Sequence, residues 1–541
     1  MRLCGGARTH KACEGTSVQE VRSNLAAAAA SDGLAVTAGK GTQLRAAGAW
    51  IVSPKAVVLG MLLFALVWLW HLDFTSLSPP VDVLEQLTWV RSLEWGYYKH
   101  PPLPTWLLWL PVKVFGWAAW TVYATGAATT LAALAIYWRL MARLRGESHA
   151  LVALLAAACI TYYNGRLYHY NHNVVLLLAS TACAALTWQA FEARQLRWWL
   201  ALGLAIGLGA LAKYQIVVTA CSVLAFALHQ RAWRDGLHRR GLLLASLVAL
   251  LTFTPHIAWL HTHDFSPVGY VMHSSLAAHF GAVTRVVEAA HWLVDQIFNR
   301  ALPALLLLLW VAASARRRPR VVNVPGPMPL DEPARARALL FAWGVVPLIF
   351  MPLVGVVAGA DLQLHWGSPF LLFAVPATME LLAPRVAWQR VEARTLVGAF
   401  LSIQLLLLTI SHVTSPRGPR GLHDGPWRNT DSQGIAAALA APARAALGGP
   451  IRVIAGPASL AGAIALELAE HPLVLIDGRF DRSPWVAANL VLDCGAIELA
   501  PSARMPSGTA FGSVLPGWSW RALPAAAAAV CPSHSRQTVT R

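Results

Sequence analysis

One short segment of this 541-residue chain holds most of the side-chain types that acid–base and phosphate chemistry require. It contains two acids, two tyrosines and two basic residues: Asp82, Glu85, Tyr97, Tyr98, Lys99 and His100. A carboxylate is a candidate general base, and a basic side chain is a candidate contact for a phosphate. The double proline that follows, Pro101 and Pro102, favours an extended backbone and would hold the basic side chains in place.

Further polar side chains lie in three other breaks in the apolar sequence. A loop over residues 162–173 and a later segment over residues 361–369 together provide five candidates for contacting a substrate. They are Arg166, Asn171, Asn173, His365 and Trp366. Lys213 interrupts an apolar run, and an intramembrane cation indicates a functional site. The alternative for Lys213 is a structural lysine whose ammonium group reaches the membrane interface.

The histidines and aromatic residues of these segments each allow two interpretations. His169, His172 and His365 are candidate ligands for a divalent ion, but scattered loop histidines are also ordinary polar residues of an interface. No Cys or His spacing is typical of a zinc site, so we expect no cofactor and assign no metal ligands. Trp366 and the two tyrosines either stack on a sugar ring or belong to the interfacial aromatic belt.

The composition is that of a membrane protein. Hydrophobic residues make up 56% of the chain and charged residues 13%, and the mean hydropathy is +0.51. Soluble domains contain about 25% charged residues, so a chain this apolar must be dissolved in lipid. The formal net charge of +17 comes from short arginine clusters between apolar runs. Because no single basic stripe is formed, the sequence excludes nucleic acid as a partner.

The apolar runs predict about eleven transmembrane helices. The first lies near Lys55–Phe74 and the last near Thr395–Val413. The arginine clusters fall in alternate connections, all on one side, and the positive-inside rule makes that side cytoplasmic. The N-terminus is then cytoplasmic, and the polar segments described above meet on the opposite, periplasmic side.

Three regions are expected along the chain. Residues 1–50 are rich in Ala, Gly, Ser and Thr without periodicity, which predicts a disordered cytoplasmic extension. Residues 51–413 form the membrane domain. Residues 414–541 are more polar and predict a linker followed by a small periplasmic α/β domain.

A β-α-β unit is expected within this last region. Its strands are Ile451–Ile454 and Leu473–Ile476, and its helix lies near Ser459–Ala469. Cys494 and Cys531 also lie in this region. An oxidising periplasm would permit a disulfide between them, but the sequence does not give their distance.

The segment from Asp82 to Pro102 resembles the first periplasmic loop of glycosyltransferase family 39. These polyprenyl-phosphate-dependent membrane enzymes include the protein O-mannosyltransferases and the bacterial aminoarabinose–lipid A transferases. Members carry an acidic motif after the first membrane helix, then an aromatic-glycine-aromatic run, here Trp95–Tyr97, and a His-Pro-Pro or Lys-Pro element, here His100–Pro102. With the predicted spans, the resemblance implies an all-α polytopic membrane protein of the GT-C type with a small C-terminal α/β domain.

The resemblance also implies catalytic roles. Asp82 takes the place of the family's aspartate that deprotonates or orients the acceptor, and Glu85 is the second catalytic candidate. Most relatives have Glu directly after the aspartate, where this chain has Val83. Relatives often carry another aspartate after the third helix, where this chain has Asn171. At these two positions the resemblance does not extend to the family's further carboxylates or to a metal that would depend on them.

Contacts for the donor phosphate are implied in the same way. His100 occupies the position before the prolines at which some relatives place a lysine that contacts the phosphate. The other candidates are Lys213, Lys99 and Arg166.

The expected activity is transfer of a sugar from a polyprenyl-phosphate donor to an acceptor at the periplasmic face of a bacterial inner membrane. The acceptor is a glycolipid, a polysaccharide or a protein, and the lipid bilayer is the other partner. Two alternatives remain. A surface-polysaccharide polymerase or ligase would share the lipid-linked donor, whereas a polytopic transporter would show internal repeats and broken helices.

Overall fold

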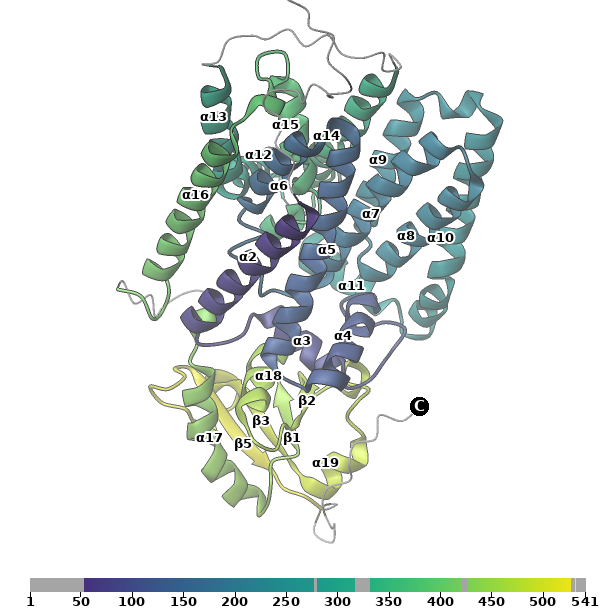
Figure 1. The fold of residues 1–541 in the computed structure, drawn as a ribbon. Coiled ribbons are helices and arrows are strands. Elements are labelled where there is room, and N and C mark those ends of the chain that lie inside the picture. Colours follow the sequence, from purple (N-terminus) through teal and green to yellow (C-terminus); the bar gives the residue numbers. More distant parts are fainter. Residues whose placement is uncertain (1–52, 277–279, 317–330, 420–426, 527–530, 532–541) are drawn as a thin grey trace, which may run out of the picture. The chain divides into compact units, whose positions relative to one another are not determined.

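A computed structural model describes residues 53–276, 280–316, 331–419 and 427–526 together with Cys531. The expected N-terminal extension, residues 1–50, lies outside the described residues. The part before residue 414 is helical (Figure 1). Its α-helices are α2 (Pro54–Thr75), α3 (Val81–Trp89), α4 (Leu103–Phe115), α5 (Ala119–Arg145), α6 (Glu147–Ala158), α7 (His172–Ala193), α8 (Leu196–Ala212), α9 (Ile216–His229), α10 (Gly236–Thr262), α11 (Ser266–Val271), α12 (Ala282–Val294), α13 (Leu302–Arg316), α14 (Asp331–Ala358), α15 (Ala374–Leu382) and α16 (Ala393–Val413).

Seven helical stretches in the described part of the chain are long and apolar enough to cross a membrane. Helix α2 is an example: Pro54 opens its first turn, and its 22 residues extend about 33 Å, which matches the hydrocarbon thickness of a bilayer. Other predicted spans correspond to shorter apolar helices such as α8 and α9. The prediction of a polytopic helical membrane protein is confirmed, whereas the number eleven remains a prediction.

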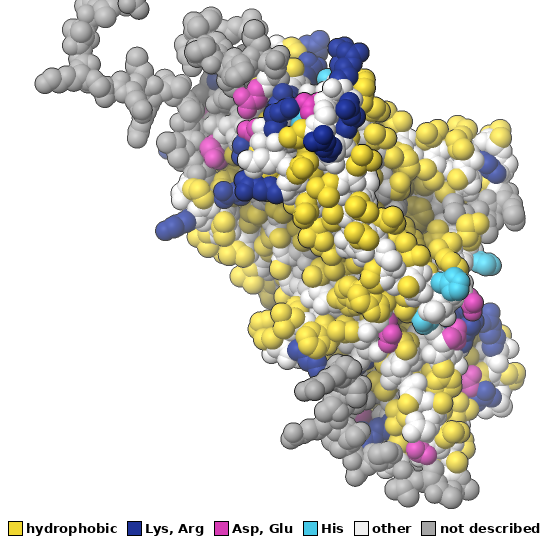
Figure 2. Space-filling model, turned by 90° about the vertical axis from the view of Figure 1, so that its right-hand side faces the viewer, with side chains coloured by type: hydrophobic (Ala, Val, Ile, Leu, Met, Phe, Trp, Pro, Cys, Tyr) yellow, Lys and Arg dark blue, Asp and Glu magenta, His cyan; other side chains and the backbone are white. Residues whose placement is uncertain are grey.

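The outer surface of these helices is apolar. Figure 2 shows hydrophobic side chains across the middle of one face, with lysine and arginine side chains gathered above them. On α2, Leu59, Leu66 and Trp70 are all exposed. Such a surface is unfavourable in water and is satisfied by lipid chains.

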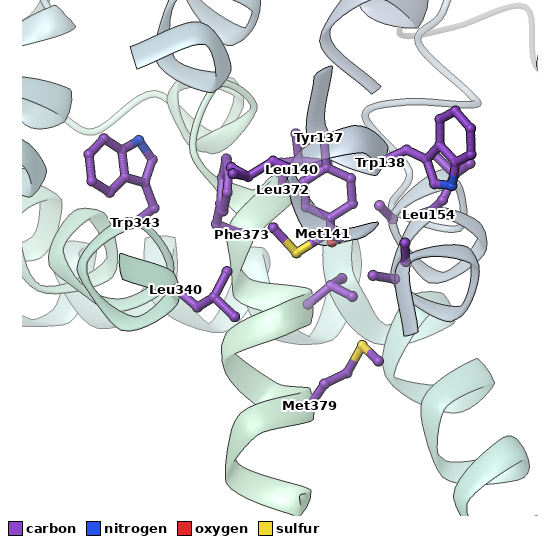
Figure 3. Packing of buried hydrophobic residues seen from close by; sticks show 14 of the residues in the cluster. Tyr137, Trp138, Leu140, Met141, Leu154, Leu340, Trp343, Leu372, Phe373 and Met379 are labelled. Carbon is purple, nitrogen blue, oxygen red and sulfur yellow. The ribbon is translucent and has the colours of Figure 1, made fainter. Parts of the chain in front are cut away.

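The helices pack around a buried core that joins α5, α6, α13, α14 and α15. Tyr137 and Met141 of α5 point toward Phe373, which lies just before α15 (Figure 3). The rings of Tyr137 and Phe373 meet edge to face with centroids 5.4 Å apart, which is a favoured aromatic geometry. This core fixes the helices whose ends carry the polar loops.

The C-terminal region forms a five-stranded sheet with strand order β2-β1-β3-β5-β4. Its elements are α17 (Ser432–Leu447), β1 (Val453–Gly456), α18 (Ala458–Glu467), β2 (Leu473–Ile476), α19 (Ala488–Cys494), β3 (Ala496–Pro501), β4 (Thr509–Ala510) and β5 (Trp518–Leu523). Strand β1 is parallel to β2 and β3, and β5 is antiparallel to β3 and β4. The predicted β-α-β unit is therefore confirmed.

Alternate residues of the strands pack into two apolar layers, one on each face of the sheet. Ile454 and Val474 face α17 and α18, whereas Val453 and Leu473 face the side on which α19 lies. This is the period of two that a strand imposes. A disulfide joins Cys494 at the end of α19 to Cys531, with Cα atoms 4.6 Å apart.

Two sets of contacts connect this region to α3. Residues 427–432 run beside residues 77–79: the N–H of Leu77 donates to the carbonyl of Arg428 at 2.8 Å, and Trp427 Nε1 donates to the carbonyl of Pro79 at 2.8 Å. Helix α18 packs along α3, with Gly462 against Leu84 and Thr88. Helix α3 is thus held at its start and along one face.

Candidate active site

Asp82 lies in the first turn of α3, a nine-residue helix that Pro80 precedes. Glu85 lies one turn later, so both carboxylates project from the same side of the helix. Leu84 and Thr88 occupy the side that packs on α18. The amide Nδ2 of Asn171 donates a hydrogen bond of 2.6 Å to Oδ2 of Asp82, which connects α3 to the N-terminus of α7.

Two cavities meet at Asp82. The first, called here the tyrosine cavity, encloses about 470 Å³ and is lined by Tyr162, Tyr163 and Tyr168 among others. The second, called the cation cavity, encloses about 590 Å³ and is lined by Lys99, His100 and Lys213 among others. Five residues line both: Val81, Asp82, Asn171, Asn173 and His365.

Lys213 is the most deeply placed cation of the cation cavity. It lies in the connection between α8 and α9, where its backbone turns to an extended conformation and ends α8. Its Nζ donates a 2.7 Å hydrogen bond to Oδ1 of Asn173 and lies 5.2 Å from the centre of a Trp366 ring. Burial lowers the pKa of Lys213 to about 7, and the nearby charge of Asp82 opposes this shift.

Lys99 and His100 line the same cavity but differ in their partners. Lys99 forms an ion pair with Glu85 and lies over the rings of Tyr98 and Tyr270. His100 stacks on His172 with ring centroids 3.8 Å apart. Burial lowers the pKa of His100 well below its usual value, and its cationic neighbours lower it further. His100 is therefore a neutral hydrogen-bonding group at pH 7, not the cation that its position suggests.

The two carboxylates of α3 have different electrostatic surroundings. Burial disfavours the charged form of Asp82, but His169 and the hydrogen bond from Asn171 outweigh it, so its pKa lies below the usual value. Burial raises the pKa of Glu85, and the charge of Lys99 only partly opposes this. Asp82 is therefore the stronger candidate for an ionised carboxylate with a free oxygen, whereas Glu85 is engaged by Lys99.

The tyrosine cavity is lined on the other side of Asp82 by Arg166 and Arg428. Arg166 comes from the loop between α6 and α7, and its guanidinium lies 5.8 Å from the centre of the Tyr162 ring. Arg428 belongs to the short turn Trp427–Asn429 before α17. Arg166 therefore lines a different cavity from Lys99, His100 and Lys213. The sequence analysis proposed all four as contacts for the donor phosphate.

Most of the residues predicted from the sequence come together here, but two do not line either cavity. Asp82, Glu85, Lys99, His100, Asn171, Asn173, Lys213, His365 and Trp366 all line the cation cavity. Tyr97 is buried and stacks on Trp89 with centroids 5.0 Å apart, while its hydroxyl donates to the carbonyl of Ser92. Tyr98 lies behind Lys99, edge to face with Tyr270. Both tyrosines shape the loop that carries Lys99 and His100.

No group of three or more His, Cys, Asp or Glu side chains within the described residues is arranged to hold a metal ion. His169 and His365 line the tyrosine cavity, and His172 lies with His100 in the cation cavity. Of the three candidate ligands, His169 lines only the tyrosine cavity, His172 lines only the cation cavity and His365 lines both.

Arg428 and Tyr270 are among the lining residues that were not predicted from the sequence. Arg428 stands next to an apparent linker, and only its pairing with Leu77 places it at the cavity. Tyr270 lies in α11, a short helix after a long span, with no motif to single it out.

Known proteins resemble this chain in sequence and in fold. The sequence profile of the dolichyl-phosphate-mannose–protein mannosyltransferase family matches residues 99–259, which include Lys99, Arg166 and Lys213. The structure of ArnT from Cupriavidus metallidurans bound to undecaprenyl phosphate is similar, with a TM-score of 0.58 and 14% identity over 89% of this chain and 100% of that chain. The chain therefore shares the fold of ArnT. The apo ArnT structure gives a TM-score of 0.52 with 17% identity over 87% of this chain and 98% of that one.

Two curated proteins are similar in sequence. They are the lipopolysaccharide core galacturonosyltransferases RgtB and RgtA of Rhizobium johnstonii, which are 28% and 26% identical over 199 and 185 residues. The matches cover 36% and 34% of this chain, and 40% and 37% of the relatives. The chain therefore spans less than half of the length of these curated relatives.

Proposed function

We propose that this GT-C protein transfers a sugar from a polyprenyl-phosphate donor in the cation cavity to an acceptor hydroxyl in the tyrosine cavity. One observation carries the proposal: Asp82 lines both cavities at once. A general base must lie within hydrogen-bond reach of the acceptor hydroxyl while the donor carbon is adjacent. The wall shared by the two cavities is the place where both requirements are met.

The lining of the cation cavity suits a lipid-linked donor. Lys213 and His100 offer a charged and a neutral hydrogen-bond donor to a phosphate. Phe350, Met351 and Val354 of α14 extend the same cavity as an apolar wall, along which a polyprenyl chain would be favourable. The similar fold of ArnT, a protein whose structure holds undecaprenyl phosphate, supports a carrier of this class.

The proposed step is a single displacement. The oxygen of the acceptor hydroxyl forms a bond to the anomeric carbon of the donor sugar, and its proton passes to the free carboxylate oxygen of Asp82. The bond between that carbon and the phosphate oxygen breaks, and the electron pair leaves with the polyprenyl phosphate. Lys213 lies on the donor side and stabilises the negative charge that this phosphate gains.

A glycolipid is the proposed acceptor, because the relatives RgtB and RgtA are named as transferases of the lipopolysaccharide core. The proposed location is a bacterial inner membrane with the site at its periplasmic face. The disulfide between Cys494 and Cys531 supports this side, because disulfides persist in oxidising compartments.

The experiment that tests the function replaces the base. Asp82→Asn keeps the size and the neighbours of the side chain but removes its basicity, so transfer from a synthetic polyprenyl-phosphate sugar to envelope glycolipids should fall about 100-fold or more. Asp361→Asn is the matched control, because Asp361 lies in a nearby loop and lines neither cavity. Transfer by Asp82→Asn at the wild-type rate would remove Asp82 from the mechanism.

A further inference from the structure

The charges of the tyrosine cavity do not balance. Among the described residues that line it, Arg166 and Arg428 carry permanent positive charge and Asp82 is the single carboxylate. Neither arginine forms an ion pair with a described carboxylate. Arg428 donates one hydrogen bond of 3.0 Å, to the carbonyl of Thr414. The remaining N–H groups of both guanidinium groups have no described acceptor.

Two other well-covered arginines are paired with acids, whereas Arg91 packs on Trp117 and donates to the carbonyl of His471. Arg145 and Arg300, whose side chains are 15% and 14% exposed, lie 2.6 Å and 3.0 Å from the carboxylates of Glu380 and Asp295. Two half-buried guanidinium groups without such partners, both at one cavity, indicate an anion that is not part of the chain.

The backbone segments that carry the two arginines are anchored separately. The turn that carries Arg428 is fixed to Leu77 and Pro79, just before α3. The loop that carries Arg166 is tied back to α6, because Asn164 Nδ2 donates to the carbonyl of Ala158 at 3.0 Å. Preorganised donors of this kind recognise the planar or tetrahedral oxygens of a carboxylate or phosphate.

We propose that Arg166 and Arg428 bind an anionic group, a phosphate or a carboxylate, of the acceptor and so place its hydroxyl at Asp82. The proposal rests on the proposed function, in which the acceptor occupies the tyrosine cavity. The donor phosphate does not need this pair, because Lys213 and His100 line the cavity that also has the apolar wall. Arg428 then becomes a specificity-determining residue supplied by the segment just before α17.

The test uses the purified full-length protein, a synthetic polyprenyl-phosphate sugar and three acceptor preparations. These are native envelope glycolipids, the same glycolipids after removal of phosphate, and the same glycolipids after reduction of carboxylates to alcohols. We expect kcat/KM to fall at least about 10-fold for one treated preparation, which identifies the anion as phosphate or carboxylate.

Substitutions of the two arginines then test whether the anionic group is bound in the tyrosine cavity. Arg428→Gln and Arg166→Gln should lower kcat/KM for the native acceptor to the value of the treated acceptor, with little further loss for the treated one, and the donor KM should stay constant. Arg428→Lys should recover part of the loss. Arg417→Gln is the matched control, because Arg417 is an exposed arginine of the preceding stretch that lines neither cavity.

Two results would overturn the inference without touching the proposed function: equal transfer to all three preparations, or a raised donor KM as the main effect of the arginine variants. Transfer to none of the preparations would overturn both. The three acceptor preparations are compared with the wild-type protein as the enzyme, and this comparison needs no variant. It therefore tests for recognition of an anionic acceptor group even where a substitution prevents folding.

Discussion

The side-chain amide of Asn171 donates a hydrogen bond of 2.6 Å to Asp82, and its own oxygen accepts from the N–H of Asn173 at 2.9 Å and of Val174 at 3.2 Å. Asn171 is therefore the N-cap of α7 and a partner of the proposed base at once. Because its oxygen is used by the helix, its nitrogen must face Asp82. An aspartate at position 171 would place two carboxylates in contact here.

The first prediction concerns a carboxylate placed at position 171. Asn171→Asp keeps the helix cap but sets a like charge against Asp82, which raises the pKa of the pair. We expect the acidic limb of the pH–rate profile to move up by about one unit or more. Asn171→Ser also keeps a helix cap and adds no charge, so the acidic limb of its pH–rate profile should move less than that of Asn171→Asp. An unchanged limb in Asn171→Asp would separate Asn171 from the base.

Lys213 supports a prediction about donor binding. Its pKa is lowered to about 7 by burial, so its positive charge is present below that pH and is lost as the pH rises through it. The affinity of polyprenyl phosphate for the wild-type protein should then weaken, by up to about tenfold per pH unit above the pKa. Lys213→Arg keeps its charge at every accessible pH and should lack this decline.

The same titration of Lys213→Arg serves as the control for ionisation of the phosphate itself. The measurement is the dissociation constant at several pH values in one detergent and one ionic strength. Parallel curves for the wild type and Lys213→Arg would show that Lys213 is a structural lysine that does not contact the phosphate.

The pair of Lys99 and Glu85 leads to a prediction about stability. Their side chains are 20% and 9% exposed, so removing one partner leaves the other charge poorly solvated. Lys99→Met should therefore lower the unfolding free energy by up to about 3 kcal/mol, and adding Glu85→Gln should restore most of it. The midpoint of thermal unfolding in detergent measures both. Equal midpoints for the single and double variants would contradict a coupled pair.

The fold and much of the site follow from sequence patterns of short range. The apolar runs and the period-two strands of the C-terminal region are local signals, and the structure has helices and a β-α-β unit at these places. Asp82 and Lys213 stand out in sequence because each is a polar residue in apolar surroundings, and His100 because it precedes the double proline. The polar residues that interrupt the apolar runs tend to lie at helix ends on the same side of the protein. This is why so many of the predicted residues line one cavity.

What the sequence could not provide depends on contacts between distant segments. Arg428 reaches the tyrosine cavity only because its carbonyl accepts from Leu77, a pairing that no local pattern encodes. Tyr97 was expected to contact a sugar, but its stacking on Trp89 places it in the apolar layer below α18. Arg166 and Lys213 likewise line different cavities, which no local pattern in the sequence indicates.

The last prediction concerns the contact between α18 and α3. A Cβ atom at Gly462 would lie 3.3 Å from Cβ of Leu84 and 3.6 Å from Oγ1 of Thr88, so glycine allows the close approach of the two helices. Gly462→Ala should be tolerated after a small shift. Gly462→Val adds two branched methyl groups against α3, and such overpacking typically costs about 1–3 kcal/mol.

Because Asp82 lies on the same short helix, we expect Gly462→Val to lower kcat about 10-fold with little change in the donor KM. Combining it with Leu84→Ala makes room for the added methyl groups and should recover part of the rate. Gly449→Val is the matched control in the same region, since no atom lies within 4 Å of its added Cβ. A wild-type kcat for Gly462→Val would mean that α18 does not set the position of Asp82.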